Sequence, residues 1–222
     1  MKAGKKGLRL GGGGREHALA WKWRQSLQGG EIFVATGNGG TSSSATNVSI
    51  QVNEVEKLLD FARENQIDLT VIGQEAASDA GVVDVFRAAG LAIFGTNKAA
   101  TKIESSKAFS KDLMRTKKIP TAEYEVFTDA KSALSYLGTA QFPLVIKADG
   151  LADGKGVTIC HDIVLAQSVI KNIMQDKSLK AAGDQVVIER FLEGQEISIH
   201  ALHDGTTTLL FPPSQDYKQV FD

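Results

Sequence analysis

The chain has 222 residues, of which 42% are hydrophobic and 23% are charged, so it can bury one large core or two small ones and is not a disordered polymer. Its 25 lysines and arginines nearly balance its 26 aspartates and glutamates, and the formal net charge of -1 excludes a global basic field that would attract nucleic acid or anionic lipid. No apolar stretch is long enough for a signal-peptide core or a membrane span, so we expect a cytoplasmic protein with neither nucleic-acid nor membrane partners.

Strands and helices alternate through the first hundred residues. Residues 1–10 form at best a weak strand, because Leu8 and Leu10 are its main apolar residues. The pattern that follows predicts a helix over 15–27, a strand over 31–35, a helix over 54–65, a strand over 68–73, a helix over 76–89 and a strand over 91–94. This alternation is typical of a parallel sheet with helices on its faces, and it predicts a doubly wound α/β domain over residues 1–103.

The rhythm changes after Ile103. The sequence predicts helices over 106–117, 128–137 and 163–175, a strand near Tyr124, and strands over 142–148, 156–160, 185–191, 196–202 and 206–210. Only seven residues separate the strands at 142–148 and 156–160, which favours an antiparallel hairpin because a parallel crossover needs a dozen or more. We therefore predict an α+β domain over residues 104–222. The single cysteine, Cys160, follows an apolar run and is expected to be a packed thiol.

A glycine run, Gly11 to Gly14, lies between the first strand and the first helix, where backbone amides and the helix dipole can receive a phosphate. The dinucleotide fingerprint requires a further glycine or alanine, but the two possible registers place Glu16 or His17 there. A hydride-transferring enzyme is therefore disfavoured. The alternative to a phosphate site is a tight turn that lets strand and helix pack closely, although Arg15, Glu16 and His17 place three polar groups on the first helical turn.

A second glycine loop, residues 150–156, connects the two strands of the predicted hairpin. It is not a phosphate-binding Walker loop, because Gly156 stands where Ser or Thr is required. Its position predicts a flap whose amides and Lys155 close over phosphates, and the alternative is an ordinary hairpin turn. Two further lysines favour the flap. Lys147 interrupts an otherwise apolar strand and is either an edge-strand surface charge or a buried cation that needs an anion, and Lys107 opens the helix at 106–117.

Eight segments together resemble phosphoribosylamine–glycine ligase, a family of the ATP-grasp superfamily. They occur in the family's order and spacing over nearly the whole chain: GGGGREHALAWK, IDLTVIGQEA, VFRAAGLAIFGTNKAAT, ESSKAFSKDLM, IPTAEY, FPLVIKADGLADGKGV, VVIERFLEGQEIS and PPSQDYK. The resemblance implies a pre-ATP-grasp domain followed by the amino-terminal part of an ATP-grasp module. The sequence departs from the family pattern at Gln74, Thr96, Asn97, Asp153, Tyr217 and Gln219.

The same resemblance implies the site residues. For ATP it implies contacts from Lys107, Lys147, Gly154, Lys155, Gly156, Glu189, Phe191, Leu192 and Glu196. For the phosphoribosylamine and substrate side it implies Gly13, Gly14, Arg15, Glu16, Asp216 and Lys218.

The activity implied by the resemblance is the ATP-dependent joining of glycine to 5-phosphoribosylamine through glycyl phosphate, in purine biosynthesis. The family's magnesium-binding carboxylates are expected beyond Asp222, so we expect this polypeptide to be inactive alone. The family domain is commonly fused to other purine-biosynthesis domains in eukaryotes. The alternative function is a noncatalytic nucleotide-binding or interaction protein derived from the same fold.

Overall fold

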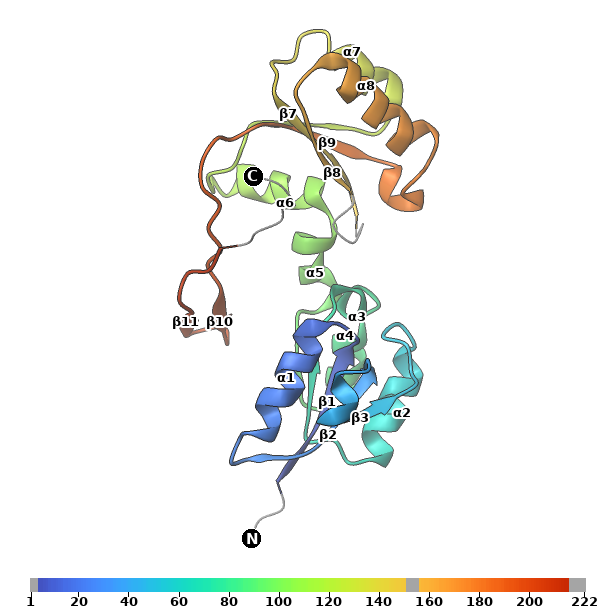
Figure 1. Ribbon diagram of the computed structural model, residues 1–222, viewed down its shortest axis with the longest axis vertical. Helices are drawn as coiled ribbons and strands as arrows, with labels where there is room; N and C mark the ends of the chain where they lie inside the picture. Colours follow the sequence, from blue (N-terminus) through green and yellow to red (C-terminus); the bar gives the residue numbers. More distant parts are fainter. Residues whose placement is uncertain (1–3, 151–155, 216–222) are drawn as a thin grey trace.

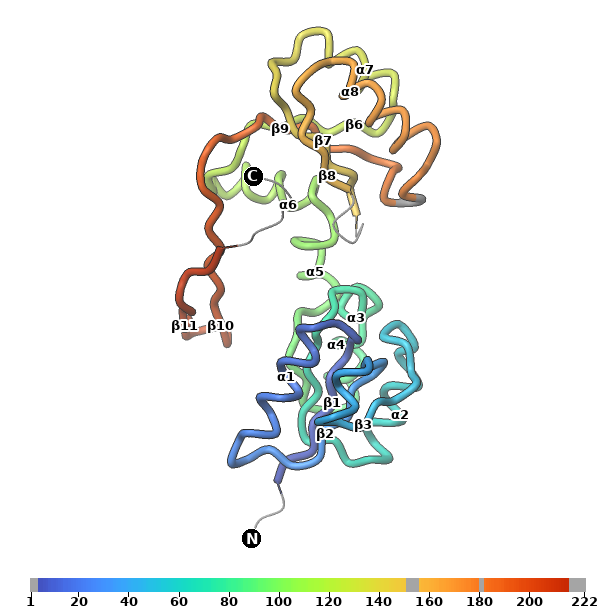
Figure 2. The backbone as a smooth tube through the Cα atoms, viewed as in Figure 1, coloured from blue at the N-terminus to red at the C-terminus, as the bar shows by residue number. Residues whose placement is uncertain are grey.

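The computed structural model describes residues 4–150 and 156–215, which form two lobes that follow one another along the chain (Figures 1 and 2). The first lobe contains a parallel sheet and the second an antiparallel sheet. Helix α5 (Lys98–Ser105) leads from the first lobe to the second. None of the helices described is both long enough and apolar enough to cross a membrane.

The first lobe is the doubly wound α/β unit that the alternating pattern predicts. Its five strands are parallel in the order β3-β2-β1-β4-β5. The strands are β1 (Lys5–Gly11), β2 (Gly29–Thr36), β3 (Thr46–Val48), β4 (Leu69–Ile72) and β5 (Ile93–Phe94). The helices are α1 (Gly14–Arg24), α2 (Val55–Glu64), α3 (Glu75–Asp79) and α4 (Val82–Ala88).

The two faces of this sheet have separate cores. On one face, Ala20 of α1 packs against Ile32 and Val34 of β2. On the other face, Leu8 and Leu10 of β1 pack with residues of α2, α3 and α4. Burial on both faces explains why helices cover each side of the sheet.

The opening strand is stronger than its composition predicts. Strand β1 is the central strand, with Leu8 and Leu10 fully buried, so the prediction of a weak strand is wrong. Alternation explains the result, because Arg9 points to the opposite face, where its guanidinium lies 4.7 Å from the centre of the Trp23 ring. Aliphatic side chains are thus needed at only every second position of β1.

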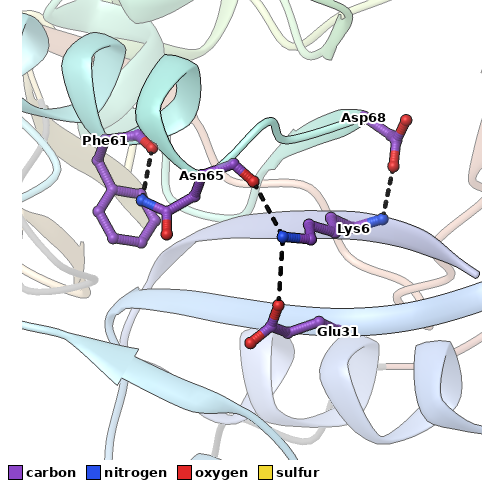
Figure 3. Close-up of polar contacts among 5 residues, drawn as sticks. All are labelled: Lys6, Glu31, Phe61, Asn65 and Asp68. Carbon is purple, nitrogen blue, oxygen red and sulfur yellow. Dashed lines mark hydrogen bonds and ion pairs between the residues drawn. The ribbon is translucent and has the colours of Figure 1, made fainter.

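Lys6 connects the start of β1 to β2 and to the segment before β4 through hydrogen bonds and an ion pair (Figure 3). Its backbone amide donates to Asp68 Oδ2 at 2.7 Å, and its Nζ donates to the carbonyl oxygen of Asn65 at 3.3 Å. Nζ also lies 3.6 Å from Glu31 Oε2 on β2. These contacts join β1 to β2 and to the segment between α2 and β4, and the exposed ion pair itself contributes little to stability.

Three local predictions for this lobe need correction. The predicted helix over 76–89 is two helices, because Gly81 adopts a left-handed φ of 88° between α3 and α4. Helix α5 was not predicted; it begins after Asn97, whose side chain accepts a hydrogen bond from the amide of Ala100, and it runs through Ile103. A third difference is a 3-10 turn, Thr41–Ser43, in a segment to which no element was assigned, with Thr41 fully buried.

The second lobe contains a four-stranded antiparallel sheet in the order β6-β9-β7-β8. Its strands are β6 (Tyr124–Phe127), β7 (Leu144–Ala148), β8 (Val157–Cys160) and β9 (Val186–Arg190). Its helices are α6 (Lys107–Thr116), α7 (Ala130–Tyr136) and α8 (Ile163–Ile170), which continues as a π-helical turn, Lys171–Gln175; a 3-10 turn, Lys180–Gly183, precedes β9. Strands β7 and β8 are antiparallel, with Leu144 opposite Cys160, which confirms the predicted hairpin.

Strand β7 separates the core of this lobe from its open face. Leu144, Ile146 and Ala148 are buried in the core beneath α7 and α8, together with Cys160. Because successive strand residues alternate, Val145 and Lys147 lie on the opposite face. The prediction of a packed thiol is confirmed, and burial raises the pKa of Cys160.

The last described segment departs most from prediction. The strand expected over 196–202 is replaced by a bridge between Ser198 and Ser214 and by β10 (Ala201–His203), which pairs with β11 (Thr208–Leu210) in a separate hairpin. Ile197, Ile199 and Leu209 are each more than 60% exposed. The alternation of apolar residues therefore predicted an extended backbone correctly. The paired strand is shorter than predicted because these side chains are not packed into a core in the described part of the chain.

Candidate functional site

A cleft of about 970 Å³ lies on the open face of the second sheet, between that face and α6. Pockets of this size accommodate ligands as large as a nucleotide. Six of the residues predicted to contact ATP line it: Lys107, Lys147, Glu189, Phe191, Leu192 and Glu196. Val145, Val157 and Ile159 supply apolar surface on the same wall. The fold therefore brings together residues that are up to 89 positions apart in sequence.

Glu189 on β9 is a buried carboxylate that pairs with two lysines of this cleft. It is only 5% exposed, and its Oε2 atom contacts two lysines, Lys111 at 2.9 Å and Lys147 at 3.0 Å. Strand β9 lies beside β7 with Glu189 opposite Val145, which brings Lys147 within reach of the carboxylate. Of the two interpretations of Lys147, the paired cation is correct, since β7 is an interior strand.

Lys111 is a cleft residue that the sequence did not single out. It lies one helical turn after Lys107 on α6 and is 7% exposed. Its spacing from Lys107 was a usable signal, because residues four apart share one face of a helix. The signal was missed because a lysine in a helix rich in lysines usually lies in solvent.

The start of the glycine loop is tied to the start of α6. Asp149 follows β7, and its Oδ1 atom accepts a hydrogen bond from the amide of Ala108 at 3.0 Å. Its Oδ2 atom accepts from Ser106 Oγ at 3.1 Å, while Ser106 Oγ accepts from the amide of Phe109 as the cap of α6. Asp149 thus shares the capping of α6, which the sequence analysis missed.

Lys107 also contacts this loop. Its Nζ donates to the carbonyl oxygen of Gly150 at 3.1 Å, where Gly150 adopts a φ of 139° that favours glycine. At the other end of the loop, Gly156 is buried, and its carbonyl accepts a hydrogen bond from the amide of Ala148. The predicted flap residues Gly154 and Lys155, like Asp153, lie outside the described residues.

The loop after β9 forms the rim of the cleft. Phe191 and Leu192 follow the strand directly, with Leu192 62% exposed. Glu196 lies beyond Gly194, whose φ of 152° turns the chain at the rim. An exposed leucine beside a charged cleft offers an apolar surface to a ring-shaped ligand. A groove of about 980 Å³ adjoins the rim around Tyr124 and Pro143, but Lys107 and Lys147 line only the first cleft.

The glycine run of the first lobe precedes α1, as predicted. Glu16 is 1% exposed, and its Oε2 atom accepts a hydrogen bond from the amide of Gly13 at 2.6 Å. Its carboxylate lies against Gly11 and Gly73, where a side-chain carbon would collide with it. Glu16 therefore caps the helix and supports the loop from beneath, and does not present its carboxylate to solvent.

Arg15 lines a smaller cleft of about 200 Å³. Its Nη1 atom donates to the carbonyl oxygen of Gly73 at 2.6 Å and to Glu75 Oε1 at 3.0 Å. The hydrogen bond to Glu75 raises the pKa of Arg15, so the guanidinium is charged at any physiological pH. Gln74, Thr96 and Glu104 line the same cleft, and Gly13 and Gly14 precede Arg15 on the loop.

Asn38 joins two loops at the carboxyl edge of the parallel sheet. Its Nδ2 atom donates to the carbonyl oxygens of Gly12 and Gly13, and its Oδ1 atom accepts from the amides of Gly40 and Thr41. The sequence analysis missed this residue. Its signal was an asparagine among glycines after a strand, where the side chain commonly bonds nearby backbone.

Two predicted substrate residues, Asp216 and Lys218, lie outside the described residues. Across residues 4–150 and 156–215, no three His, Cys, Asp or Glu side chains gather as ligands for a metal ion. Glu189, the buried carboxylate of the cleft, is paired with two lysines.

Two family models match nearly the whole chain. The family model of the phosphoribosylglycinamide synthetase N domain matches residues 6–104, and that of the phosphoribosylglycinamide synthetase ATP-grasp (A) domain matches residues 105–222. Among curated relatives, the phosphoribosylamine–glycine ligase of Clostridium acetobutylicum is 46% identical over 215 residues, covering 97% of this chain and 52% of that protein. The corresponding ligase of Escherichia coli strain K12 is 48% identical over 217 residues, covering 97% and 51%.

Solved structures agree with the sequence relatives. A phosphoribosylamine–glycine ligase from Thermotoga maritima superimposes with a TM-score of 0.81 at 31% identity, covering 96% of this chain and 51% of that one. An ADP complex of N5-carboxyaminoimidazole ribonucleotide synthetase gives 0.71 at 18% identity, covering 99% and 56%, which shows a shared fold alone. The chain spans about half the length of the curated relatives it matches.

Proposed function

This chain belongs to the phosphoribosylamine–glycine ligase family of ATP-grasp enzymes, and we propose that its second lobe binds ATP for the ligation of glycine to 5-phosphoribosylamine. The complete reaction would form glycyl phosphate and ADP, and the ribosylamine nitrogen would then displace phosphate to form the amide in purine biosynthesis. A carboxylate is a poor electrophile until phosphorylated, so the nucleotide site is the first requirement.

The observation that carries this proposal is the group of charged side chains in the 970 Å³ cleft between the open face of the second sheet and α6. This cleft is called the larger cleft below, in contrast to the smaller cleft at Arg15. Lys107, Lys111 and Lys147 supply cations, and Glu189 supplies a buried carboxylate. A triphosphate in this cleft would be met by Lys107 and Lys147, since phosphoryl transfer requires cations around the developing charge. The base would lie toward Phe191, Leu192 and the apolar wall, with Glu196 near the ribose.

Gly156 ends the glycine loop directly before β8, where its carbonyl oxygen accepts a hydrogen bond from the amide of Ala148. Gly154 and Lys155 complete the proposed flap on the strength of the family resemblance. Magnesium is expected with ATP in this family, and one distant structural neighbour is described as a complex with the magnesium salt of ADP. When bound, that ion would neutralise phosphate charge, and we assign it no ligands among the described residues.

The substrate side of the proposal centres on Arg15. Its charged guanidinium lines the smaller cleft and would attract the phosphate of phosphoribosylamine. The amide of Gly14 precedes it on the loop, while the amide of Gly13 is already bonded to Glu16. Glu16 would act through Gly13 by holding the loop. Asp216 and Lys218 belong to this part of the proposal by resemblance. Glycine and phosphoribosylamine are water-soluble metabolites, so a cytoplasmic location belongs to the same proposal, as does fusion to other purine-biosynthesis domains.

A thermal melt tests the nucleotide site. ATP at a hundredfold excess over its dissociation constant should stabilise the chain by about 2.7 kcal/mol, and Lys147→Ala should remove about half of this stabilisation or more at the same ATP concentration. An unchanged melting temperature in millimolar ATP with magnesium would overturn the proposal. Binding of ATP without ligase activity in a protein that contains the complete family sequence would favour the noncatalytic alternative.

A further inference from the structure

Two lysines share a single oxygen of Glu189. Lys111 Nζ lies 2.9 Å from Oε2, and Lys147 Nζ lies 3.0 Å from the same atom. The other carboxylate oxygen, Oε1, is buried and has no hydrogen-bond partner in residues 4–150 and 156–215. One negative charge is therefore paired with two positive charges, one more than neutralisation requires.

The two lysines are held differently. The Lys111 side chain is 9% exposed, and its Nζ also donates to Thr121 Oγ1 at 2.7 Å. Its Nζ lies 5.6 Å from the centre of the Tyr124 ring, a further attraction for a cation. The Lys147 side chain is 27% exposed in the cleft, and its Nζ has the contact to Glu189 as its hydrogen bond. Lys111 is thus fixed at the base of the cleft, while Lys147 borders its open space.

We propose that Lys111 is a positioning residue that frees Lys147 to move from Glu189 to the phosphates of a bound nucleotide. This inference rests on the proposed function, because it requires a triphosphate in the larger cleft. When Lys147 turns toward the phosphates, Glu189 keeps Lys111 as its counter-ion. The carboxylate then keeps a counter-ion and its orientation, and its Oε1 atom can accept a hydrogen bond from an N–H donor of the ligand.

The physical reason is the cost of an unpaired buried charge. Removing one partner of a buried ion pair is strongly destabilising, because the remaining charge has lost both water and its counter-ion. Without Lys111, departure of Lys147 would leave Glu189 in that state. Lys147 would then stay on Glu189, and the phosphates would lose a cation although Lys147 itself is present.

This mechanism predicts a loss that depends on the phosphates of the ligand. The measurement is calorimetric titration of this chain with ATP and with adenosine, and the quantity compared is the ratio of the two affinities. Lys111→Met should lower that ratio about tenfold, because a charged contact to phosphate is lost. Lys111→Arg, which keeps the charge, should restore most of it. Lys117→Met, at an exposed lysine just after α6, is the matched control and should leave the ratio unchanged.

A double-mutant cycle isolates the coupling. Lys147→Met should lower the ratio on its own, and adding Lys111→Met should lower it no further, because Lys111 acts through Lys147. Thr121→Val, which removes the hydroxyl partner of Lys111 and keeps its charge, should lower the ratio in the same direction by about threefold. This milder variant decides the question if Lys111→Met does not fold.

The outcomes separate the two levels of inference. If the wild-type chain fails to bind ATP, the proposed nucleotide site is wrong. If it binds ATP but Lys111→Met or Thr121→Val weakens ATP and adenosine equally, Lys111 is a structural residue and the inference is overturned. Additive effects of the Lys111 and Lys147 substitutions on the ratio would overturn it as well.

Discussion

The carboxylate of Asp149 accepts a hydrogen bond from the amide of Ala108 at 3.0 Å, which joins the end of β7 to the first turn of α6. Two lysines assigned to the nucleotide stand beside this junction, Lys147 on β7 and Lys107 at the start of α6. The spacing between the lysines therefore depends on a residue that need not touch the ligand. Asp149 also accepts from Gln185 Nε2 at 3.3 Å, which extends the junction to the residue before β9.

We expect Asp149→Ala to destabilise the chain by about 1–2 kcal/mol, because loss of a helix cap leaves backbone donors unpaired. Urea unfolding followed by circular dichroism measures the change. Asp149→Asn, which keeps an acceptor oxygen and removes the charge, is the matched control and should cost less. Equal stability of Asp149→Ala and wild type would show that the carboxylate does not cap α6 in solution.

Lys147→Ala should weaken ATP binding by roughly ten- to a hundredfold, because a charge-assisted contact to phosphate contributes about 1.5–3 kcal/mol. Calorimetric titration with ATP measures the effect. Lys131→Ala, at an exposed lysine of α7, is the control for a general change in charge and should bind ATP as the wild type does. Equal affinity of the Lys147 variant and wild type would remove this residue from the nucleotide site.

Glu16→Ala should destabilise the first lobe by about 1–3 kcal/mol, since the Gly13 amide loses its partner and a buried side chain leaves a cavity. Glu75→Ala is a matched carboxylate deletion on the other side of Arg15, with an exposed ion pair that should contribute less than about 1 kcal/mol. Thermal unfolding of both variants makes the comparison. A greater loss from Glu75→Ala would contradict the assigned supporting role of Glu16.

Arg9→Leu should stabilise the chain by about 1–3 kcal/mol. Arg9 is 5% exposed, its Nε and Nη1 atoms have no partners in the described part of the chain, and burial lowers its pKa to about 10. The lowered pKa reflects the cost of burying the guanidinium charge, and loss of the contact with Trp23 reduces the gain. Chemical unfolding at pH 7 measures the change in the free energy of unfolding. The control is Arg63→Leu, a substitution at an exposed arginine.

The pH dependence of the Arg9 effect has a defined sign. Below pH 10 the guanidinium is charged in both states, so the cost of burying it is fully present. As pH rises above about 10, the folded state releases its proton before the unfolded state does, so the unfolded state binds more protons and the cost declines. The stability difference between Arg9→Leu and wild type should therefore be constant from pH 7 to 9 and shrink above pH 10. A difference that grows above pH 10 would contradict the assignment.

The sequence predicted the two sheets well where periodicity and loop length constrain them. The short separation of residues 142–148 and 156–160 allowed only an antiparallel pair, and β7 and β8 form one. The hydrophobic pattern gave wrong helix boundaries where a single residue ends or begins a helix. Gly81 breaks a continuous helical pattern by its left-handed backbone, and Asn97 starts a helix in a segment that resembles a loop. Ile197 and Ile199 alternate as in a strand, yet find no neighbour to pair with in the part described.

The candidate site divides in the same way. Lys147 stood out because it interrupts an apolar strand, and Glu189 was implied by the family resemblance. Lys111 and Asp149, in contrast, occupy positions where charged residues are common. Burial distinguishes Lys111 from its solvated neighbours, and only the packing of α6 against β9 reveals it. Glu16 shows the reverse limit, because its polar character suggested contact with a ligand while its surroundings give it a backbone amide.

Glu104 lines both the larger cleft beside Lys107 and the smaller cleft beside Arg15, so the two clefts meet at one side chain of α5. An acyl phosphate is a short-lived species that water can destroy before the amine reaches it. If the activated carboxylate forms in one cleft and the amine is bound in the other, helix α5 fixes the separation between the two groups. Neither group then has to diffuse through solvent to reach the other. The turn of α5 that ends at Glu104 would then be the structural link between the two clefts.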